Sequence, residues 1–517
     1  MQFVLRLRPD IHKKISKIPS GIVTGNKYDV ETFQAYSTYF HETLHWWQHI
    51  GSVSGFILSL TYPAQTHVNH KHLKDYLHQT GAIKSIVKYN KIFAKEYNPN
   101  SNEFKTINLI LNNFHDIEFF KYLTINPKSA ESICKDSLFE SVGHSYYIAY
   151  SSFINLLSAS FDNEFLFLPN PKKWIKGFGK LRENKVSGYY FGSNITLPRI
   201  GLKEIYEGQA RFSQIQYLYF GSGGNLAWID FEELGMLSGD YYKAFAIFLE
   251  LIESKRPDSI DSPLVALFLV VLDIAMNPGE GFPFEIIDYE YFINSTDPGL
   301  RFTFLCVSIR ENYPDLKTFI KDYSNSEYLD VVSKLSAAIN SPSPLDVASC
   351  VLEWADHYEE LVKLKSEEKH FTFSAENQPI RLLFSRFLRY QEDKLNNPAY
   401  FCWPGAHSAG ERCTDVNLKL FLEHQSLFTD KADGDIYPRI FPDKNMSSVK
   451  ESFDIFYTWV VTYDLCRQWI IDDGPFKYDY FWLSSKHSKE TLEEWARRHF
   501  KFAYGVDTTE FEIAQEA

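Results

Sequence analysis

Positions 41–45 of the chain read His-Glu-Thr-Leu-His, which is the H-E-x-x-H pattern. On a helix, this spacing places two imidazoles one turn apart, so that both can bind one zinc ion while the glutamate acts as a general base. At about 100° per residue, His41, His45 and Gln48 fall on one face beside an apolar stripe, and Glu42 lies next to that face. We therefore predict a catalytic zinc centre with one ion per chain, His41 and His45 as ligands and Glu42 as the catalytic base.

Catalytic zinc normally has three protein ligands, so one ligand is missing from this motif. The extended pattern H-E-x-x-H-x-x-G-x-x-H does not fit, because Gln48 stands at its glycine position and Gly51 at its third histidine. His49 lies eight residues after His41, about 12 Å along a helix axis, and both rings could not easily reach one ion. The third ligand must therefore come from a distant part of the chain.

The best candidate for the third ligand is Glu207, in the sequence Ile-Tyr-Glu-Gly-Gln-Ala at 205–210. A helical pattern runs over 202–219, and we expect the small residues at 208 and 210 to let this helix approach the metal-bearing helix closely. The alternative for Glu207 is an ion pair with Arg211 at i+4 on the helix surface. Glu118, on an earlier helical pattern at 104–123, is the second candidate, and an Asp or His elsewhere is the third possibility.

The two segments together resemble the gluzincin class of zinc metallopeptidases, in which a glutamate on a second helix, often within Glu-Gly-x-Ala, completes the site. The resemblance covers only these two short segments, and it implies His41, His45 and Glu207 as ligands with Glu42 as base. Tyr206 stands where the aminopeptidases of this class have Asn, and 161 residues separate His45 from Glu207. The resemblance therefore implies a large helical insertion between the two halves of the site.

The metal-bearing segment has the strongest helical pattern in the chain. Phe33, Tyr36, Phe40, Leu44 and Trp47 form one apolar stripe, and Asp29 can cap the first turn. Helices are also predicted over 241–252, 264–276, 346–368, 381–394 and 489–499, and the one over 264–276 is apolar on all sides and so buried. A short edge strand is predicted at 3–8, and the region between the last two helices reads as loop-rich and aromatic.

Composition excludes several classes of protein. The 517 residues are 44% apolar and 16% aromatic with a net charge of -13, which is typical of a folded soluble protein and unfavourable for binding nucleic acid. The longest apolar run, 264–272, is too short for the roughly 20 residues of a membrane span, so no membrane partner is expected. Six scattered cysteines and a charged N-terminal segment without an apolar core favour a cytoplasmic protein.

The fold that these patterns predict is α+β and mostly α-helical. Proline and serine cluster at 341–344, so we place a zincin-like metallopeptidase domain at 1–335, with a helical insertion, and a helical C-terminal domain of unknown role at 345–517. The expected function is hydrolysis of peptide bonds in a restricted protein substrate, with an activating partner as one route to restriction. The alternatives are a pseudoenzyme or binding protein with a structural zinc site, and a zinc hydrolase of a non-peptide amide or ester.

Two further groups of residues in the C-terminal part have alternative interpretations. Cys402, His407 and Cys413 lie within twelve residues and could ligate a structural zinc, although ordinary thiols are favoured because no matching pair follows. Aromatic residues are dense there and indicate either a docking surface or a second hydrophobic core: Tyr400, Phe401, Trp403, Tyr478, Tyr480, Phe481 and Trp482.

Overall fold

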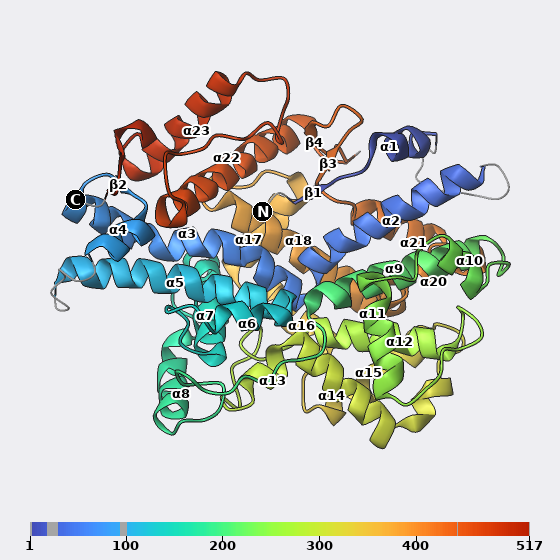
Figure 1. Cartoon of the computed structure of the whole chain (residues 1–517). Helices are drawn as coiled ribbons and strands as arrows, with labels where there is room; N and C mark the ends of the chain where they lie inside the picture. Colours follow the sequence, from blue (N-terminus) through green and yellow to red (C-terminus); the bar gives the residue numbers. More distant parts are fainter. Residues whose placement is uncertain (1–2, 18–28, 94–100, 442, 516–517) are drawn as a thin grey trace.

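A computed structural model of the chain describes residues 3–17, 29–93, 101–441 and 443–515. Helix accounts for 66% of the structure and strand for 3%, which confirms the prediction of a mostly helical chain. The helices form layers around α2 and α9, which lie side by side in Figure 1. Among the described residues, none of the helices combines the length and the apolarity that crossing a bilayer demands.

The first part of the chain places α2 and α9 in contact, and α3 packs against α2 and α11 against α9. Its elements are β1 (Val4–Leu5), α1 (Pro9–Ile15), α2 (Val30–Gly51), α3 (Val53–Thr80), β2 (Ile83–Lys84), α4 (Ile86–Phe93), α5 (Asn102–Ile125), α6 (Ala130–Ile133), α7 (Val142–Phe161), α8 (Pro171–Glu183), α9 (Leu202–Gly221), α10 (Trp228–Glu233), α11 (Asp240–Leu251), α12 (Pro263–Met276), α13 (Phe292–Thr296), α14 (Pro298–Glu311) and α15 (Asn325–Ala338).

The remainder of the chain packs back onto this part, and α22 and α23 lie along the upper edge of Figure 1. Its elements are α16 (Pro344–His357), α17 (Glu359–His370), α18 (Gln378–Asn396), α19 (Pro398–Cys402), α20 (Pro404–His407), α21 (Asp415–Glu423), β3 (Phe428–Asp430), β4 (Ile436–Pro438), α22 (Met446–Ile471), α23 (Lys489–Tyr504) and β5 (Glu512–Ile513). Short 3-10 helices occupy Pro127–Ser129, Pro314–Thr318, Gly410–Arg412 and Thr508–Glu510.

The strands pair each end of the chain with a segment near the opposite end. β1 pairs in parallel with β3, and β3 pairs antiparallel with β4, so β1 is an edge strand as the sequence predicts. β2 and β5 form a second, two-stranded parallel sheet. The N-terminal strand therefore lies beside residues more than 400 positions away. The neighbouring Phe3 contacts Trp46 and His49 near the C-terminal end of α2.

Two predicted features of the C-terminal part are wrong. The predicted helix over 346–368 is two helices, α16 and α17, with an extended residue at Tyr358 between them. The region predicted as loop-rich contains α22, a helix of 26 residues. Its buried side chains Val449, Phe456, Val460 and Tyr463 recur at helical spacing, and the density of aromatic residues obscured that period.

One hydrophobic core includes residues from both sides of position 340. Phe56 of α3 stacks on Phe387 of α18 with ring centroids 4.4 Å apart, and Trp47 of α2 contacts Tyr390. The division into domains at 1–335 and 345–517 stays a prediction. Of the seven aromatic residues singled out in the C-terminal part, four are buried, as in the core interpretation: Tyr400, Phe401, Trp403 and Tyr480. Tyr478 and Trp482 are half-buried, and Phe481 is exposed.

The junction of α2 and α3 requires small residues. Gly51 ends α2, and a Cβ atom there would lie 2.4 Å from the ring of Tyr390. Ser52 separates the helices and caps α3 by accepting a hydrogen bond from the backbone N–H of Gly55. In addition, Gln391 of α18 donates to the carbonyl of Gly51 at 2.8 Å. The end of α2 is thus fixed directly against α18.

Candidate metal centre

The motif at 41–45 lies in the middle of α2, where the helix is held on its apolar side. Asp29 caps the helix by accepting from the backbone N–H of Thr32 at 2.7 Å, as the sequence predicts. Phe40, Leu44 and Trp47 are buried in the core. The packing of this stripe turns the neighbouring face, with the motif's imidazoles, towards α9.

Glu207 comes to the same place from α9, which crosses α2. Gln48 joins the two helices, because its side-chain amide donates to the carbonyl of Tyr206 at 2.9 Å and to Oε1 of Gln209 at 3.0 Å. Figure 1 shows α2 and α9 meeting near the centre of the molecule. The structure therefore brings together His41, His45 and Glu207, although 161 residues separate the two segments.

Three donor atoms of this cluster form a nearly equilateral triangle. The Nε2 atoms of His41 and His45 are 3.2 Å apart, and Oε2 of Glu207 lies 3.5 Å from each. A tetrahedral zinc ion with ligands at ~2.0–2.1 Å separates them by about 3.3–3.4 Å. Oε2 of Glu207 is also buried without a hydrogen-bond partner, which is costly unless an ion satisfies it. The residues present fit a zinc ion held by two imidazoles and one carboxylate.

The protonation of the cluster follows from burial and proximity. Burial lowers the pKa of His41 to about 4, so this imidazole is neutral and can bind a metal. Burial acts in the same direction on His45, but Glu207 and Gln48 outweigh it and raise the pKa of that ring. Burial would raise the pKa of Glu207, yet the two histidines lower it overall. Glu207 is therefore an anion facing two nitrogen donors.

Gln48 orients the second histidine. Its Oε1 lies 2.8 Å from Nδ1 of His45, and its amide nitrogen is already committed to two acceptors on α9. Nδ1 of His45 must therefore carry the proton in this contact, which leaves the lone pair of Nε2 for a metal. Sequence reasoning placed Gln48 on the correct face but did not identify this role. The signal was its position, one turn after the second histidine of the motif.

Glu42 is half-buried beside the cluster and is not one of its three members. Burial raises the pKa of its carboxyl group, and the nearby positive charge of Arg211 partly offsets this effect. The alternative interpretation of Glu207, a surface ion pair with Arg211, is not what the structure shows, because the ion-pair contacts of Glu207 among the described residues are with His41 and His45. The guanidinium of Arg211 lies 4.0 Å from the ring centre of Tyr241, and it donates to Gln214 at 2.5 Å. Sequence reasoning missed this cation as a component of the site.

The small residue at 208 has a different role from the one predicted. A Cβ atom at Gly208 would lie 3.2 Å from Cβ of Ala244 on α11 and 3.3 Å from the ring of Phe268 on α12. Gly208 therefore permits close packing of α9 on those helices rather than on α2. The physical reason is the rotation of about 100° per residue, which turns position 208 away from Glu207.

The second candidate ligand, Glu118, is engaged elsewhere. Its Oε1 accepts hydrogen bonds from Gln65 at 2.7 Å and from Lys121 at 2.6 Å. In the part of the chain that the structure describes, the only group of three or more metal-binding side chains that could hold one ion is the His41, His45 and Glu207 cluster. Glu118 thus serves to connect α3 and α5.

The C-terminal cysteines and His407 do not converge either. Cys402 is fully buried and Cys413 is exposed, and both are free thiols. Nε2 of His407 lies 2.9 Å from the carbonyl oxygen of Tyr323 and is held by the backbone. His144 likewise lies away from the cluster, 3.4 Å from the buried carboxylate of Asp116. The two histidines thus contact a backbone carbonyl and a carboxylate, and neither belongs to the His41, His45 and Glu207 cluster.

A cavity of about 450 Å³ adjoins the metal cluster on one side. Glu42 and His45 line it from α2, and the N-terminal strand forms its opposite wall. Burial lowers the pKa of His49, a further lining residue, to about 4, so its ring is neutral at physiological pH. A substrate that enters this cavity meets the proposed base directly.

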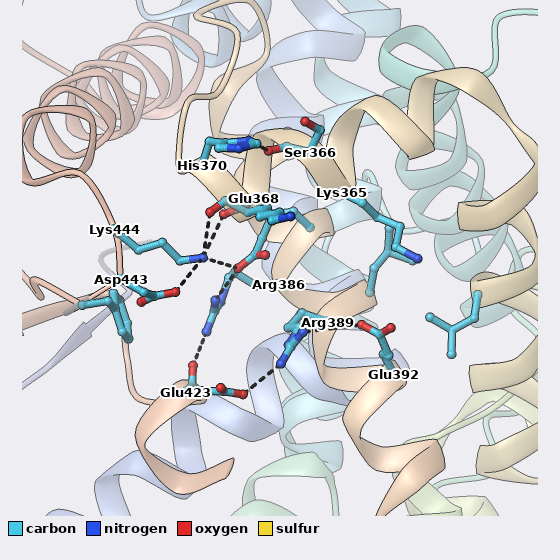
Figure 2. Close-up of a pocket in the computed structure, with 15 residues that line it drawn as sticks. Lys365, Ser366, Glu368, His370, Arg386, Arg389, Glu392, Glu423, Asp443 and Lys444 are labelled. Carbon is cyan, nitrogen blue, oxygen red and sulfur yellow. Dashed lines mark hydrogen bonds and ion pairs between the residues drawn. The ribbon is translucent and has the colours of Figure 1, made fainter. Parts of the chain in front are cut away.

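A larger cavity of about 670 Å³ lies between α17, α18 and α21 and the segment around Lys444, and its described lining includes no residue of α2. Figure 2 shows Arg386, Arg389 and Lys444 of this cavity in contact with carboxylates. Arg386 pairs with Glu368 at 3.0 Å, and Arg389 pairs with Glu423 at 2.9 Å. The charges of this cleft therefore compensate one another.

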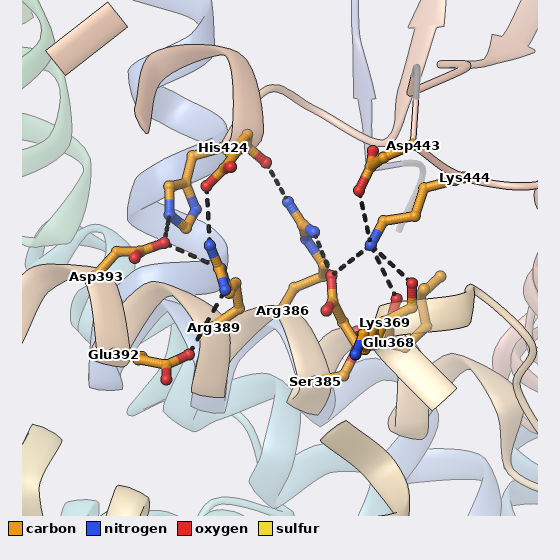
Figure 3. Close-up of polar contacts among 12 residues, drawn as sticks. Glu368, Lys369, Ser385, Arg386, Arg389, Glu392, Asp393, His424, Asp443 and Lys444 are labelled. Carbon is orange, nitrogen blue, oxygen red and sulfur yellow. Dashed lines mark hydrogen bonds and ion pairs between the residues drawn. The ribbon is translucent and has the colours of Figure 1, made fainter. Parts of the chain in front are cut away.

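The same network extends to His424 (Figure 3), and His424 contacts α2. Arg389 contacts Asp393 at 3.0 Å, and Asp393 lies 2.8 Å from Nε2 of the buried His424. The carbonyl of His424 in turn accepts a hydrogen bond from the indole of Trp47 at 2.8 Å. The charged cleft thus positions α18 and α21 against α2, and its contribution to the site is structural.

Comparisons with protein-family models, with curated proteins and with solved structures gave no match. The chemistry of the site is therefore argued from its geometry and donor set alone.

Proposed function

We propose that this protein is a zinc-dependent metallopeptidase with a zincin-like catalytic region, one zinc ion per chain and a restricted protein or peptide substrate. The observation that carries this proposal is the triangle of His41, His45 and Glu207 donor atoms beside a glutamate at the second position of H-E-x-x-H. Oε2 of Glu207 is buried, makes no hydrogen bond and faces the two imidazole nitrogens at 3.5 Å, an arrangement that supports a shared ion. The resemblance to gluzincins points to the same three ligands.

The chain's own residues account for substrate positioning and proton transfer. A zinc ion held by the three ligands supplies Lewis acidity, which polarises the scissile carbonyl and makes water more acidic. Glu42 takes a proton from the attacking water and then donates it to the leaving amine. Its raised pKa favours this double role, because a carboxylate of very low pKa would be a weak base.

Apolar side chains line part of one side of the site. Trp46 and Phe3 are packed edge to face with ring centroids 6.0 Å apart, and both line the cavity beside Glu42. A drier environment strengthens the interaction between charged groups and a developing oxyanion. Arg211 adds a positive charge on the other side of the cluster, which compensates the two neighbouring carboxylates.

The experiment that tests the proposal compares the wild-type chain with Glu42→Gln. Because Glu42 is a base and not a ligand, the variant is expected to fold and keep about one zinc per chain while cleavage falls about 10²–10⁴-fold. Cleavage products of a proteome-derived peptide library are identified by mass spectrometry, with and without a chelator. Chelator-insensitive cleavage, or full activity in Glu42→Gln, would remove the peptidase assignment.

The restricted substrate is part of the proposal. The net charge of -13 and the compact helical surroundings of the cluster favour a narrow choice of substrates, or a partner that activates the enzyme. We expect weak or absent cleavage of casein by the purified chain. Two alternatives stay open: a binding protein with structural zinc, which would show metal without cleavage, and a hydrolase of non-peptide amides or esters, which a metabolite screen would reveal.

A further inference from the structure

The helix α8 lies at the edge of the molecule and carries a concentration of positive charge. Figure 1 shows it at the lower left, away from α2 and α9. It packs on α7, and the side chains of Trp174 and Phe178 are buried. Its 13 residues include four lysines and one arginine against a single carboxylate, that of Glu183. This positive charge is local, because the whole chain has a net charge of -13.

Three of these lysines share the side of α8 that faces away from the core. At about 100° per residue, Lys172, Lys176 and Lys180 lie within about 80° of one another and opposite the buried Trp174. All three are exposed. Among the residues that the structure describes, none of the three forms an ion pair with a carboxylate. We call these three residues the lysine face.

The carboxylates near α8 leave the lysine face uncompensated. Glu285 pairs with Lys173 at 3.4 Å, and Glu140 pairs with Arg182 at 3.5 Å. Two more exposed carboxylates, Asp288 and Glu290, belong to the loop over 285–291. That loop packs against Gly177, on a different side of the helix from the lysine face. Glu183 is one charge at the end of α8 against three unpaired lysines.

Large apolar side chains are exposed beside the lysine face. Ile175 is 57% exposed on α8 itself, and Phe191 is 74% exposed shortly after the helix ends. Ile287 is 83% exposed in the loop over 285–291, whose Tyr289 ring covers Gly177 of α8. Single exposed apolar residues are common, but three of them around one cationic face indicate an interaction surface.

We propose that α8 and its two neighbouring loops dock the protein on an anionic lipid surface. The lysine face would contact the negative headgroups, and Ile175, Phe191 and Ile287 would enter the boundary between headgroups and acyl chains. A nucleic acid would match the charges but would leave the apolar side chains in water. Surface docking requires no spanning helix, so this inference goes beyond the sequence-based expectation of no membrane partner. It also goes beyond the proposed function, because it rests on α8 and not on the metal centre.

The test is co-sedimentation of the full chain with lipid vesicles. Vesicles of phosphatidylcholine alone are compared with vesicles of equal parts phosphatidylcholine and phosphatidylserine. We expect the chain to bind the phosphatidylserine vesicles more tightly by about tenfold or more, and this binding to weaken as the salt concentration rises. Soluble polyglutamate serves as the probe for an acidic protein partner.

Two sets of variants locate the effect. The double variant Lys176→Glu with Lys180→Glu reverses two unpaired charges and should weaken binding to phosphatidylserine vesicles by about tenfold or more. The matched control is Lys255→Glu with Lys450→Glu, which makes the same change in net charge at exposed lysines outside α8 and should bind as wild type. Phe191→Ser removes an exposed ring and should weaken vesicle binding severalfold without changing the charge.

The possible outcomes decide the inference. It is overturned if the chain binds neither kind of vesicle, if the α8 double variant binds as tightly as its control, or if Phe191→Ser binds as tightly as wild type. Binding to polyglutamate without binding to vesicles would assign the face to an acidic protein and would also overturn it. Zinc content should be the same in all of these variants, so a failure of the docking inference leaves the proposed function standing.

Discussion

Replacing Gln48 with leucine tests whether the contact between α2 and α9 shapes the metal centre. Gln48 is 3% exposed and makes three hydrogen bonds, to Nδ1 of His45, the carbonyl of Tyr206 and Oε1 of Gln209. Leucine removes all three and leaves buried polar groups without partners. At about 1–3 kcal/mol for each unsatisfied group, with incomplete additivity, we expect a loss of about 2–5 kcal/mol in the free energy of unfolding.

The effect on zinc has a separate cause. Without Gln48, His45 can change its tautomer or rotate, so its Nε2 no longer points at the other two donors. Loss of such an orienting partner typically weakens metal affinity by about 10–100-fold. Zinc affinity is measured by competition with a chromophoric chelator, at a temperature well below the unfolding transition, so that global stability does not enter the result.

Gln65→Leu is the matched control. Gln65 is also 3% exposed, and it donates to the carbonyl of Phe114 and to Oε1 of Glu118 on a different pair of helices. We expect this variant to lose about 1–3 kcal/mol of stability and to keep zinc affinity within twofold. The reasoning is refuted if Gln48→Leu binds zinc as tightly as wild type, or if Gln65→Leu loses affinity to the same degree.

Three other predictions follow from the structure. Glu207→Ala should lose most of its bound zinc, whereas Glu118→Ala should keep it. Metal analysis of the two purified variants tests this, and the reverse result would place the site at α5. Burial alone would lower the pKa of His144, but the carboxylates of Asp116 and Glu140 outweigh burial and raise this pKa. The raised pKa stabilises the fold below the unfolded-state pKa of about 6.5. This stabilisation is lost as the pH rises through the folded-state pKa. His144→Gln should therefore destabilise the protein more in urea unfolding at about pH 5.5 than at about pH 8.5, and an equal loss at both would contradict the ion pair. Gly51→Ala should lower the thermal unfolding midpoint, because the added Cβ would lie only 2.4 Å from the ring of Tyr390 and would clash with it. An unchanged midpoint would contradict this prediction.

The parts of the site that follow from local periodicity were predictable from the sequence. The helix around His41 and His45 has an apolar stripe and a capping Asp29, and both features depend on residues within one or two turns. The donor pattern of the motif could be recognised for the same reason. Glu207 could be identified from the sequence only as a candidate ligand, because the packing of α9 on α2 depends on contacts between segments that are 161 residues apart.

Features that depend on long-range packing were not predictable. The sequence does not reveal that the strand at Val4 and Leu5 forms a wall of the cavity beside Glu42, since that requires pairing with β3. It also does not reveal which neighbour Gly208 faces, because a small residue permits close packing but does not determine which helix packs there. The position of Arg211 depends on packing in the same way: the i+4 spacing allowed an ion pair with Glu207 as an alternative, and the structure places the guanidinium over Tyr241.

The central claim is that one zinc ion is held by side chains of α2 and α9. The most direct test is a crystal structure of the zinc-loaded protein with anomalous data collected on both sides of the zinc absorption edge. The account predicts one strong anomalous peak at ~2.0–2.2 Å from Nε2 of His41, Nε2 of His45 and a carboxylate oxygen of Glu207. A peak bound by other residues, or no peak at this cluster in a protein that contains zinc, would contradict it.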